Sequence, residues 1–566
     1  MLTMLAAAPP PRAGMSWPDY AMVVAYLFLT AGIVWWSSRK DASTEQFFLG
    51  GRRMPWFAVG LSIMATLLST ITYLGMPGEL IKNGITAMAI YFSYPFVFLV
   101  VFWLFVPFFM RLRLTSAYEY LDLRFNYATR VVGGVLFFFL RIGWIALVMY
   151  TAAMALEGMT SAHLRRLLTP LGLEDQGLYV MIVALGITAT VYAFFGGMRA
   201  VVWTDVLQAV MLFGGAALII FYVMATTGSG VGTWWEAASA QAKGRMKPIL
   251  FDMNPTVRLT VFTVILDGFF WQICTHGSDQ VVLQRYFTTV SVRAARNSFI
   301  LNLVAQLLIG VLLMLAGLAL LYFYLVNREY LGGGLTIDSS ADKIMPYFYA
   351  HQLPLGFGGL ILANFICDAM QTLVSGVNSM TAVATDDLFH NKSSQRTRAE
   401  SDRRQLWTAR LLTIGIGLFC TLLAVGAAVV AQVPNGPNIY DLLPRMFNMF
   451  LGPLGSLFFV GMFIPRATAR SVLPALGLAL FVSVSWSWWQ QLYGTHHAWY
   501  VNLFQDPATP DVPPGPPSIK WAIALPCLIG FSTAALLSRI FDPPGDHPGR
   551  AYSWREVMKR KPPVEE

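Results

Sequence analysis

The chain has 566 residues, of which 56% are apolar and 12% are charged. Soluble domains average roughly 45–50% apolar and about 25% charged residues, so this composition excludes an ordinary soluble protein and predicts one that crosses a membrane many times. A net charge of +9 would also suit a nucleic-acid-binding protein. The lysines and arginines lie in short loops between apolar runs, however, so we expect the lipid bilayer, and no nucleic acid, as a partner.

Thirteen apolar runs approach the ~20 residues that a helix needs to cross a bilayer. The predicted spans are 17–37, 55–80, 87–110, 129–158, 177–195, 200–226, 259–277, 297–327, 355–389, 406–432, 442–464, 471–493 and 519–540. Residues 1–16 carry neither the basic segment nor the small-residue exit of a signal peptide, so we expect the first span to be retained.

The distribution of Lys and Arg predicts how these spans are oriented. Of the 39 basic residues, 26 fall on the side that holds the C-terminus and 11 on the other side, while Arg141 and Arg445 lie within predicted spans. Because cytoplasmic loops carry the excess of basic residues, we expect a cytoplasmic C-terminus and an external N-terminus in a plasma or inner cell membrane. The main external loops are then 227–258, 328–350 and 495–518.

The ninth predicted span carries a stripe of polar residues. They recur at steps of three and four and therefore share one face of a helix: Asp368, Gln371, Thr372, Ser375, Asn378 and Ser379. Small hydroxyl residues in such a stripe often do no more than pack helices together. An intramembrane carboxylate is costly and usually faces a cavity or a bundle interior, so Asp368 favours a path for a solute or a cation.

Two other spans contain residues that weaken a membrane helix. In the second, four hydroxyl residues precede the Gly-Met-Pro-Gly segment 75–78, and in the seventh, Asp267, His276 and Asp279 surround Gly277. Five spans separate the two, which is the spacing of an inverted five-helix repeat whose broken first helices bind substrate and cations at the midplane. Simple kinks, and a histidine that only stabilises the core, are the alternatives.

The reactive residues do not indicate an enzyme. The four cysteines are far apart in apolar runs and are interpreted as buried apolar residues: Cys274, Cys367, Cys420 and Cys527. The sequence contains no Ser-His-Asp, HExxH or paired-Cys arrangement with usable spacing. We therefore expect no enzymatic activity and no cofactor.

Six segments, in order along the chain, resemble the sodium:solute symporter family, which has a LeuT-like fold. They are FFLGGRRMPWFAVGLSIMATLLST at 47–70, TSAYEYLDLRF at 115–125, FFGGMRAVVWTDVLQ at 194–208, SDQVVLQRY at 278–286, VNSMTAVATDDLF at 377–389 and GPLGSLFFVGMFIPR at 452–466. The resemblance implies an all-α polytopic membrane protein of about 13 transmembrane helices with a 5+5 inverted repeat. The implied parts are an external tail at 1–16, an extra helix at 17–37, five-helix repeats at 55–226 and 259–464 joined by an external loop at 227–258, two further helices at 471–540 and a cytoplasmic tail at 541–566.

The resemblance also implies a sodium site, with sodium as the coupling ion. Its ligands fall at the backbone carbonyls of Ala65 and Leu68 and at Asp368, Gln371 and Thr372, and an aspartate near the cation exit path falls at Asp205. Thr372 keeps a hydroxyl that relatives use, whereas Gln371 and Asp368 depart from the family pattern. Residues i, i+3 and i+4 share a helix face, so the three side chains could still meet at one ion, and all supply the oxygen ligands that a hard cation prefers.

The substrate positions of the family fall at residues that do not suit a sugar. They are Leu67, Ser69, Ile71, Thr72 and Tyr91 in the first two repeat helices and Gln272, Thr275 and His276 in the sixth. The first set cannot hold a ring of hydroxyl groups by bidentate hydrogen bonds. We therefore favour a small organic solute, such as a monocarboxylate or another anion.

The functional hypothesis is sodium-coupled symport of a small organic solute by alternating access between the repeat halves. A membrane sensor or scaffold that keeps the fold without transport is one alternative, because the sodium site is irregular. A proton-coupled symporter is another, because Asp368 could carry a proton instead of facing a sodium ion. The sequence leaves the solute, the stoichiometry, the oligomeric state and any protein partner open.

Overall fold

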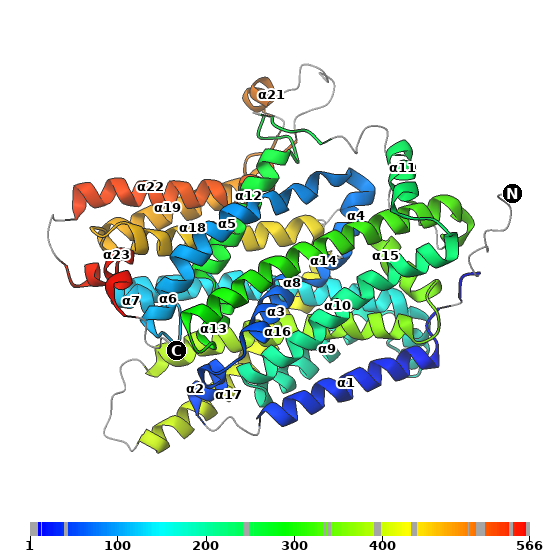
Figure 1. Cartoon of the computed structure of the whole chain (residues 1–566), viewed down its shortest axis with the longest axis horizontal. Helices are drawn as coiled ribbons and strands as arrows, with labels where there is room; N and C mark the ends of the chain where they lie inside the picture. The colour runs from blue at the N-terminus through cyan, green and yellow to red at the C-terminus, as the bar shows by residue number, and fades with distance from the viewer. Residues whose placement is uncertain are drawn as a thin grey trace.

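The computed structural model describes residues 10–12, 14–38, 43–241, 248–252, 254–332, 335–337, 341–389, 398–431, 439–495, 497–504, 515–542 and 547–561. These residues form α-helices, numbered α, and short turns of 3₁₀-helix, numbered η, of which η3 is a π-helical turn. Within the described ranges the single β-type pairing is an isolated bridge between Met54 and Thr289. The all-α fold that was predicted from the sequence is therefore confirmed (Figure 1).

In chain order the first half contains α1 (Trp17–Ser38), α2 (Thr44–Leu49), η1 (Gly50–Arg52), α3 (Trp56–Leu67), α4 (Thr70–Asn83), η2 (Ile85–Ser93), α5 (Tyr94–Val100), η3 (Val101–Phe105), α6 (Val106–Leu112), α7 (Glu119–Arg124), α8 (Tyr127–Leu168), η4 (Thr169–Leu171), α9 (Gly177–Phe195), α10 (Met198–Thr227) and α11 (Val231–Gln241). The second half contains α12 (Val261–Ser278), α13 (Gln280–Phe287), α14 (Val292–Val326), η5 (Arg328–Tyr330), α15 (Ala341–His351), α16 (Phe357–Phe389), α17 (Arg398–Ala431), α18 (Ile439–Phe463), α19 (Ala469–Ser487), α20 (Trp489–Leu492), α21 (Ala498–Phe504), η6 (Ile519–Trp521), α22 (Ala524–Phe541), η7 (Pro548–Tyr552) and α23 (Trp554–Lys559).

The number of membrane spans differs from the prediction. Among the described residues, eleven helices are long and apolar enough to cross a membrane, or up to twelve if the bent pair α3 and α4 forms one span. Each of the thirteen predicted runs coincides with helical structure, but the seventh, which is α12, is not among these candidates. Its 18 residues include Asp267, Gln272 and His276, which lower its apolar character, so a count of thirteen is not confirmed.

The second predicted span is broken, but not where the Gly-Met-Pro-Gly segment suggested. The axes of α3 and α4 meet at 63°, and the break lies at Leu68 and Ser69, while segment 75–78 lies inside α4. Leu68 is extended, and the Ser69 hydroxyl accepts a hydrogen bond from Thr72 N–H as the N-cap of α4. The helix breaks where a cap can satisfy its exposed amides, because Pro77 removes only one donor from the interior of α4.

The seventh predicted span is interrupted close to Gly277, as expected. Helix α12 ends at Ser278, Asp279 has an extended backbone, and α13 begins at Gln280. The Asp279 carboxylate accepts a hydrogen bond from Val281 N–H and so caps α13. Both proposed repeat halves therefore open on a broken helix, which is the feature that the five-span spacing predicted.

Helix α16 lies inside the bundle, and the other helices pack around it. It contacts α1, α8, α10 and α17, and its side chains are almost entirely buried, whereas α1 and α17 expose much of their surface. In Figure 1 the start of α1 lies at the same end of the molecule as α11 and α15, while α2, α7 and α23 lie at the opposite end. Which end faces the cytoplasm remains a prediction of the charge distribution.

Candidate functional site

The polar stripe of α16 is buried in the structure. All six of its members are at most 7% exposed. They face the break of α3 and α4 on one side and α10 and α13 on the other, through hydrogen bonds made by Asp368, Gln371, Ser375 and Ser379. Helix packing alone would need neither the carboxylate of Asp368 nor its neighbours' amide groups, those of Gln208 and Gln284. The stripe is therefore a candidate for more than a packing role.

Asp368 joins α16 to the broken helix. Its Oδ2 accepts hydrogen bonds from the N–H and the hydroxyl of Thr70, which is the first residue of α4, and its Oδ1 accepts one from Gln208 Nε2 at 2.8 Å. The first amides of a helix lack partners within it and carry a partial positive charge, so they stabilise a carboxylate. The carboxylate thus accepts a hydrogen bond from a backbone amide that the break leaves without a partner inside the helix.

Gln371 lies next to the other half of the broken helix. Its Nε2 donates to Thr66 Oγ1 at 2.9 Å, and Thr66 Oγ1 donates to the carbonyl of Ser62 at 2.7 Å. Ala65 and Leu68, the predicted carbonyl ligands, are buried on the same stretch of α3, and Thr372 is buried beside Gln371 on α16. Asp368 and Gln371 therefore contact the two halves of the broken helix, and the other predicted sodium ligands, Ala65, Leu68 and Thr372, are buried residues close to these contacts in the sequence.

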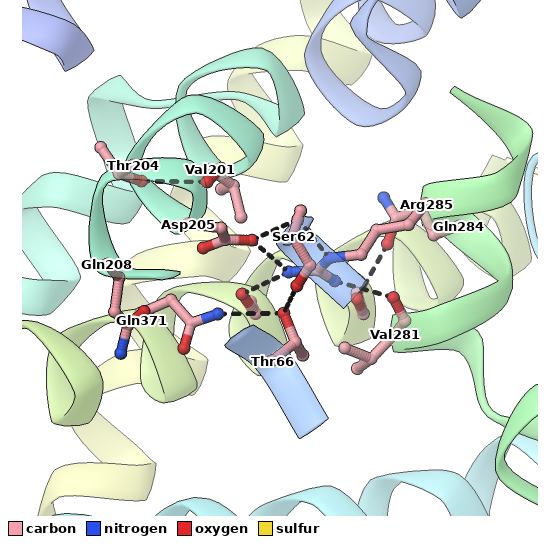
Figure 2. A network of polar contacts seen from close by, with 12 residues as sticks. Ser62, Thr66, Val201, Thr204, Asp205, Gln208, Val281, Gln284, Arg285 and Gln371 are labelled. Carbon is pink, nitrogen blue, oxygen red and sulfur yellow. Dashed lines mark hydrogen bonds and ion pairs between the residues drawn. The ribbon is translucent and has the colours of Figure 1, made fainter. Parts of the chain in front are cut away.

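Asp205, the predicted exit-path residue, belongs to a buried ion pair (Figure 2). Its Oδ2 accepts hydrogen bonds from the Ser62 hydroxyl and, at 3.0 Å, from Arg285 Nη2. Arg285 also donates to Ser62 Oγ and Ser375 Oγ, both at 2.8 Å, and its side chain and that of Asp205 are fully buried. The network unites α3, α10, α13 and α16. Arg285 was not predicted to be functional, although this residue lies in the SDQVVLQRY segment.

Three buried oxygen atoms around this network lack a donor. Asp205 Oδ1, Gln208 Oε1 and Gln371 Oε1 have no partner in hydrogen-bonding geometry within the part of the chain that the structure describes. Figure 2 shows the three side chains extending from α10 and α16 into one region. Unpaired buried acceptors cost free energy unless a donor or a cation satisfies them, and oxygen ligands suit a hard cation. Gln208 was also missed, although it lies one helical turn after Asp205.

Helix α13 closes one end of this region. All eight of its residues are buried. Besides Arg285, Gln280 accepts a hydrogen bond from Ala117 N–H at 2.6 Å, and Gln284 donates to the carbonyl of Phe48 and accepts from Ser379, both at 2.8 Å. These side chains of α13 bind five parts of the molecule, namely α2, α3, α10, α16 and the turn before α7. Helix α13 is thus fixed beside α2 and α6.

The second break is held by another buried charge pair. Arg141 of α8 donates through Nε to Asp279 Oδ1 at 3.2 Å and also contacts Oδ2. Nearby, His276 Nδ1 and the Tyr286 hydroxyl are hydrogen-bonded at 2.7 Å, and the histidine ring packs against Phe299. His276 therefore connects α12 to α13. This position fits the alternative interpretation of a histidine that stabilises the core.

The remaining predicted solute residues divide into two groups. Gln272 Nε2 donates to Gln306 Oε1 at 2.9 Å, the Tyr94 hydroxyl donates to the same oxygen at 3.0 Å, and Gln306 Nε2 donates to Asn302 Oδ1 at 2.8 Å. Tyr91 packs on Tyr94 and Thr275 lies one turn after Gln272, so they belong with this amide cluster (Gln272, Asn302 and Gln306). Asn302 and Gln306 were missed because they lie in the following span, outside the matched segments.

The second group lines a cavity beside α4. Ile71 and Thr72 border an open cavity of about 170 Å³ together with Met76, Met88 and Met314. Glu79 lies at this cavity and forms two hydrogen bonds, of 2.9 and 3.0 Å, with Arg258. Leu67 and Ser69 are buried at the break itself. The predicted solute residues therefore lie in separate places, at the break, beside the cavity and at the amide cluster, and not in a single pocket.

The comparisons with known proteins identify the family. The sequence model of the sodium:solute symporter family matches residues 47–477. Similar proteins include a sodium/sialic acid symporter, NanT, of Aliivibrio fischeri, which is 29% identical and aligns over 83% of this chain and 87% of its own, and the human sodium-coupled monocarboxylate transporter 1, which is 30% identical over 82% and 72%. A putative sodium-dependent multivitamin transporter of Drosophila melanogaster is 30% identical over 83% of this chain and 74% of its own.

The fold is also found in a solved structure. The substrate-bound, outward-open form of a Na⁺-coupled sialic acid symporter superposes with a TM-score of 0.75 at 24% identity, covering 93% of this chain and 99% of the other. This likeness establishes the fold, and the family model covers most of the chain. The protein is therefore a multi-pass membrane transporter and not an enzyme. By both its sequence and its fold, the chain belongs to the sodium:solute symporter family.

Proposed function

We propose that this protein couples the entry of sodium to the uptake of a small organic solute by alternating access. The observation that carries the proposal is the set of buried oxygen atoms at the break of α3 and α4, where Asp368 and Gln371 approach the broken helix and where Asp205 Oδ1 and Gln208 Oε1 lack donors within the described structure. Oxygen ligands at an unwound membrane helix are the usual means by which such carriers hold a cation.

In this proposal sodium is bound by the carbonyls of Ala65 and Leu68 and by Asp368, Gln371 and Thr372. Asp368 already bonds the first amide of α4, so an ion beside it would connect α16 to both halves of the broken helix. Sodium binding would then stabilise one arrangement of the broken helix relative to α16. That difference in affinity between two arrangements is what a coupling ion must supply.

The buried pair of Asp205 and Arg285 serves in this proposal as the inner gate. Opening the inner end requires α3 and α13 to move away from α10 and α16, and this movement separates Arg285 from Asp205. The freed carboxylate of Asp205 would then be the next anionic group along the path of a departing sodium ion. Gln208, which contacts Asp368, lies between the two carboxylates and supplies a further oxygen.

The solute site is proposed at the amide cluster, with access through the cavity beside α4. The relatives carry sialic acid, monocarboxylates and vitamins, and we propose a small organic acid for this chain as well. The N-termini of α4 and α13 are already bonded to Asp368 and Asp279, so they are not available to a solute carboxylate. The unpaired Asn302 Nδ2 and the Thr275 hydroxyl, both buried and without partners in the described structure, are the donors proposed to bind it.

Uptake into proteoliposomes tests this function. Radiolabelled sialic acid, short monocarboxylates and vitamin carboxylates would be offered under an inward sodium gradient, under equal sodium on both sides, and under a pH gradient without sodium. We expect at least one acid to accumulate above equilibrium with the sodium gradient alone. Accumulation driven by the pH gradient would replace sodium with protons as the coupling ion, and binding without any accumulation would favour a sensor.

A further inference from the structure

The segment before α1 and the first turn of α1 bind the connection between α15 and α16. Asp19 is fully buried, and its Oδ2 accepts hydrogen bonds from Arg12 Nη2 at 2.5 Å, from Ser16 N–H at 2.9 Å and from the Ser16 hydroxyl at 2.7 Å. Its Oδ1 accepts bonds from the N–H groups of Gly356 at 2.9 Å and Gly359 at 3.1 Å. Five donors therefore converge on one carboxylate that lies far from the candidate site in the sequence.

The same segment also binds the end of α15. Arg12 Nη1 donates to the carbonyl of Leu353 at 2.8 Å, and Arg12 N–H donates to the carbonyl of His351, the last residue of α15, at 2.7 Å. A cation thus lies at the C-terminal end of α15 and an anion at the N-terminal end of α16, which is the arrangement that both helix dipoles favour. Residues 351–359, here termed the elbow, are held at both ends.

The backbone of the elbow is shaped for this contact. A Cβ atom on Gly359 would lie 1.9 Å from the carbonyl oxygen of Asp19, so only glycine permits the close approach of α1 and α16. Gly356 has φ of +89°, a conformation that residues with side chains rarely adopt. The contact therefore depends on specific residues in both partners and is more than the incidental packing of an additional helix.

The elbow connects two elements that the proposed mechanism uses. Helix α15 packs on α4, the half of the broken helix that lines the open cavity, and the hydroxyl groups of Tyr349 and Tyr73 are 3.4 Å apart. Phe365 of α16 contacts both tyrosine rings. Asp368 follows Gly359 by nine residues, which is ~14 Å along a helix. The orientation of α15 over α4 and the position of α16 are thus both fixed at the elbow.

We propose that Arg12, Ser16 and Asp19 form a latch that fixes the elbow, and that Asp19 is a positioning residue for the packing of α15 on α4. Without the latch, α15 separates from α4 more readily, and the buried contact between Tyr73 and Tyr349 is exposed for a larger fraction of time. The proposal rests on the proposed function only for its effect on transport, since the separation of α15 from α4 can be measured without transport.

Thiol labelling measures this separation directly. Tyr73→Cys places a reporter on α4 beneath α15, where the native side chain is fully buried, and the four native cysteines are buried as well. A membrane-impermeant maleimide would be applied to the full-length protein in intact cells. Asp19→Asn keeps the size of the side chain but removes the charge that binds Arg12, and losing charge-assisted hydrogen bonds of this kind shifts an equilibrium by about tenfold. We expect labelling about tenfold faster than in the reporter protein with Asp19 intact, and a similar direction for Arg12→Gln.

Asp542→Asn is the matched control. Asp542 accepts hydrogen bonds from Thr468 N–H, the Thr468 hydroxyl and the Ser471 hydroxyl at the start of α19, so it is a buried helix cap outside the two repeats. This variant should lower thermal stability without faster labelling at residue 73. Labelling of Asp19→Asn and Arg12→Gln at the wild-type rate would overturn the latch, as would equal acceleration by Asp542→Asn.

A transport measurement separates the latch from general damage. The latch holds the elbow and not the sodium ligands. Asp19→Asn should therefore lower the maximal uptake rate per molecule at the cell surface, and the sodium concentration that gives half-maximal uptake should change less than twofold. An equal loss of sodium affinity would contradict the positioning role. Absence of sodium-coupled uptake in the wild-type protein would contradict the proposed function instead, and the labelling result would still decide the latch.

Discussion

At the scale of single residues, Asp368 shows what could be predicted from the sequence and what could not. Its presence in a membrane helix was sufficient to identify the polar stripe, because a carboxylate inside a membrane is costly and is usually functional. Its partners were not predictable, since Thr70 lies 298 residues away and Gln208 lies 160 residues away. The sequence identified a costly group, and only the fold supplied the donors that stabilise it.

Thr372→Ala tests the proposed sodium ligand that departs least from the family pattern. The variant leaves a buried polar site short of one oxygen, a loss on the order of 1–3 kcal/mol, or about 5- to 150-fold in apparent sodium affinity. Half-saturation by sodium in uptake assays measures the effect. Thr381→Ala is a matched control, because this buried hydroxyl lies on the same helix but faces Thr413. Equal sodium dependence in the two variants would exclude Thr372 as a ligand.

Asp368→Asn distinguishes sodium from protons as the driving ion. The amide keeps the size of the side chain and one oxygen but removes the charge and the ability to titrate. We expect weaker sodium affinity with uphill uptake that recovers at high sodium concentration. A protein driven by protons would instead lose uphill uptake at every pH. Wild-type dependence on both sodium and pH would mean that Asp368 only packs α16 against α4.

At the scale of elements, the positions of the spans were predictable, and the position of one break was not predictable from the local residues. Apolarity is a local property of the chain, so each predicted run coincides with helical structure. The break between α3 and α4 depends on a cap at Ser69 and on Asp368 from α16. Glycine and proline in α4 gave the wrong location, whereas the family resemblance had placed carbonyl ligands of the broken helix at Ala65 and Leu68. The break at Asp279 was predicted well because its cap is adjacent in sequence.

The proposed inner gate, the buried pair of Asp205 and Arg285, can be tested by its effect on thermal stability. Arg285→Gln leaves Asp205 buried without its ionic partner, and breaking a buried pair in this way costs on the order of 3–5 kcal/mol. We expect each single variant, Arg285→Gln or Asp205→Asn, to lower the thermal unfolding midpoint in detergent more than the double variant does. Midpoint shifts that simply add would show that the two side chains are not coupled, which contradicts the gate.

At the scale of the whole molecule, the family and the all-α fold were both predictable from the sequence, because six separate segments matched in order. The count of thirteen spans was less secure. Helix α12 contains polar residues that serve the candidate site, and the same residues make it too polar to qualify by composition.

The orientation in the membrane remains a prediction of the 26 to 11 distribution of basic residues. The structure places the start of α1 and the helices α7 and α23 at opposite ends of the bundle, as that prediction requires (Figure 1). A tag before residue 1 should be accessible on intact cells, and a tag after residue 566 only after permeabilisation. The reverse pattern would invert the assignment of the inner gate.

The central claim is that sodium and solute cross together through the site at the broken helix. The most direct test measures radioactive sodium and labelled solute entering the same proteoliposomes. The account predicts that solute increases sodium entry, that sodium increases solute entry, and that Thr372→Ala shifts both to higher sodium concentration by the same factor. Sodium entry that does not respond to a transported solute would contradict the account.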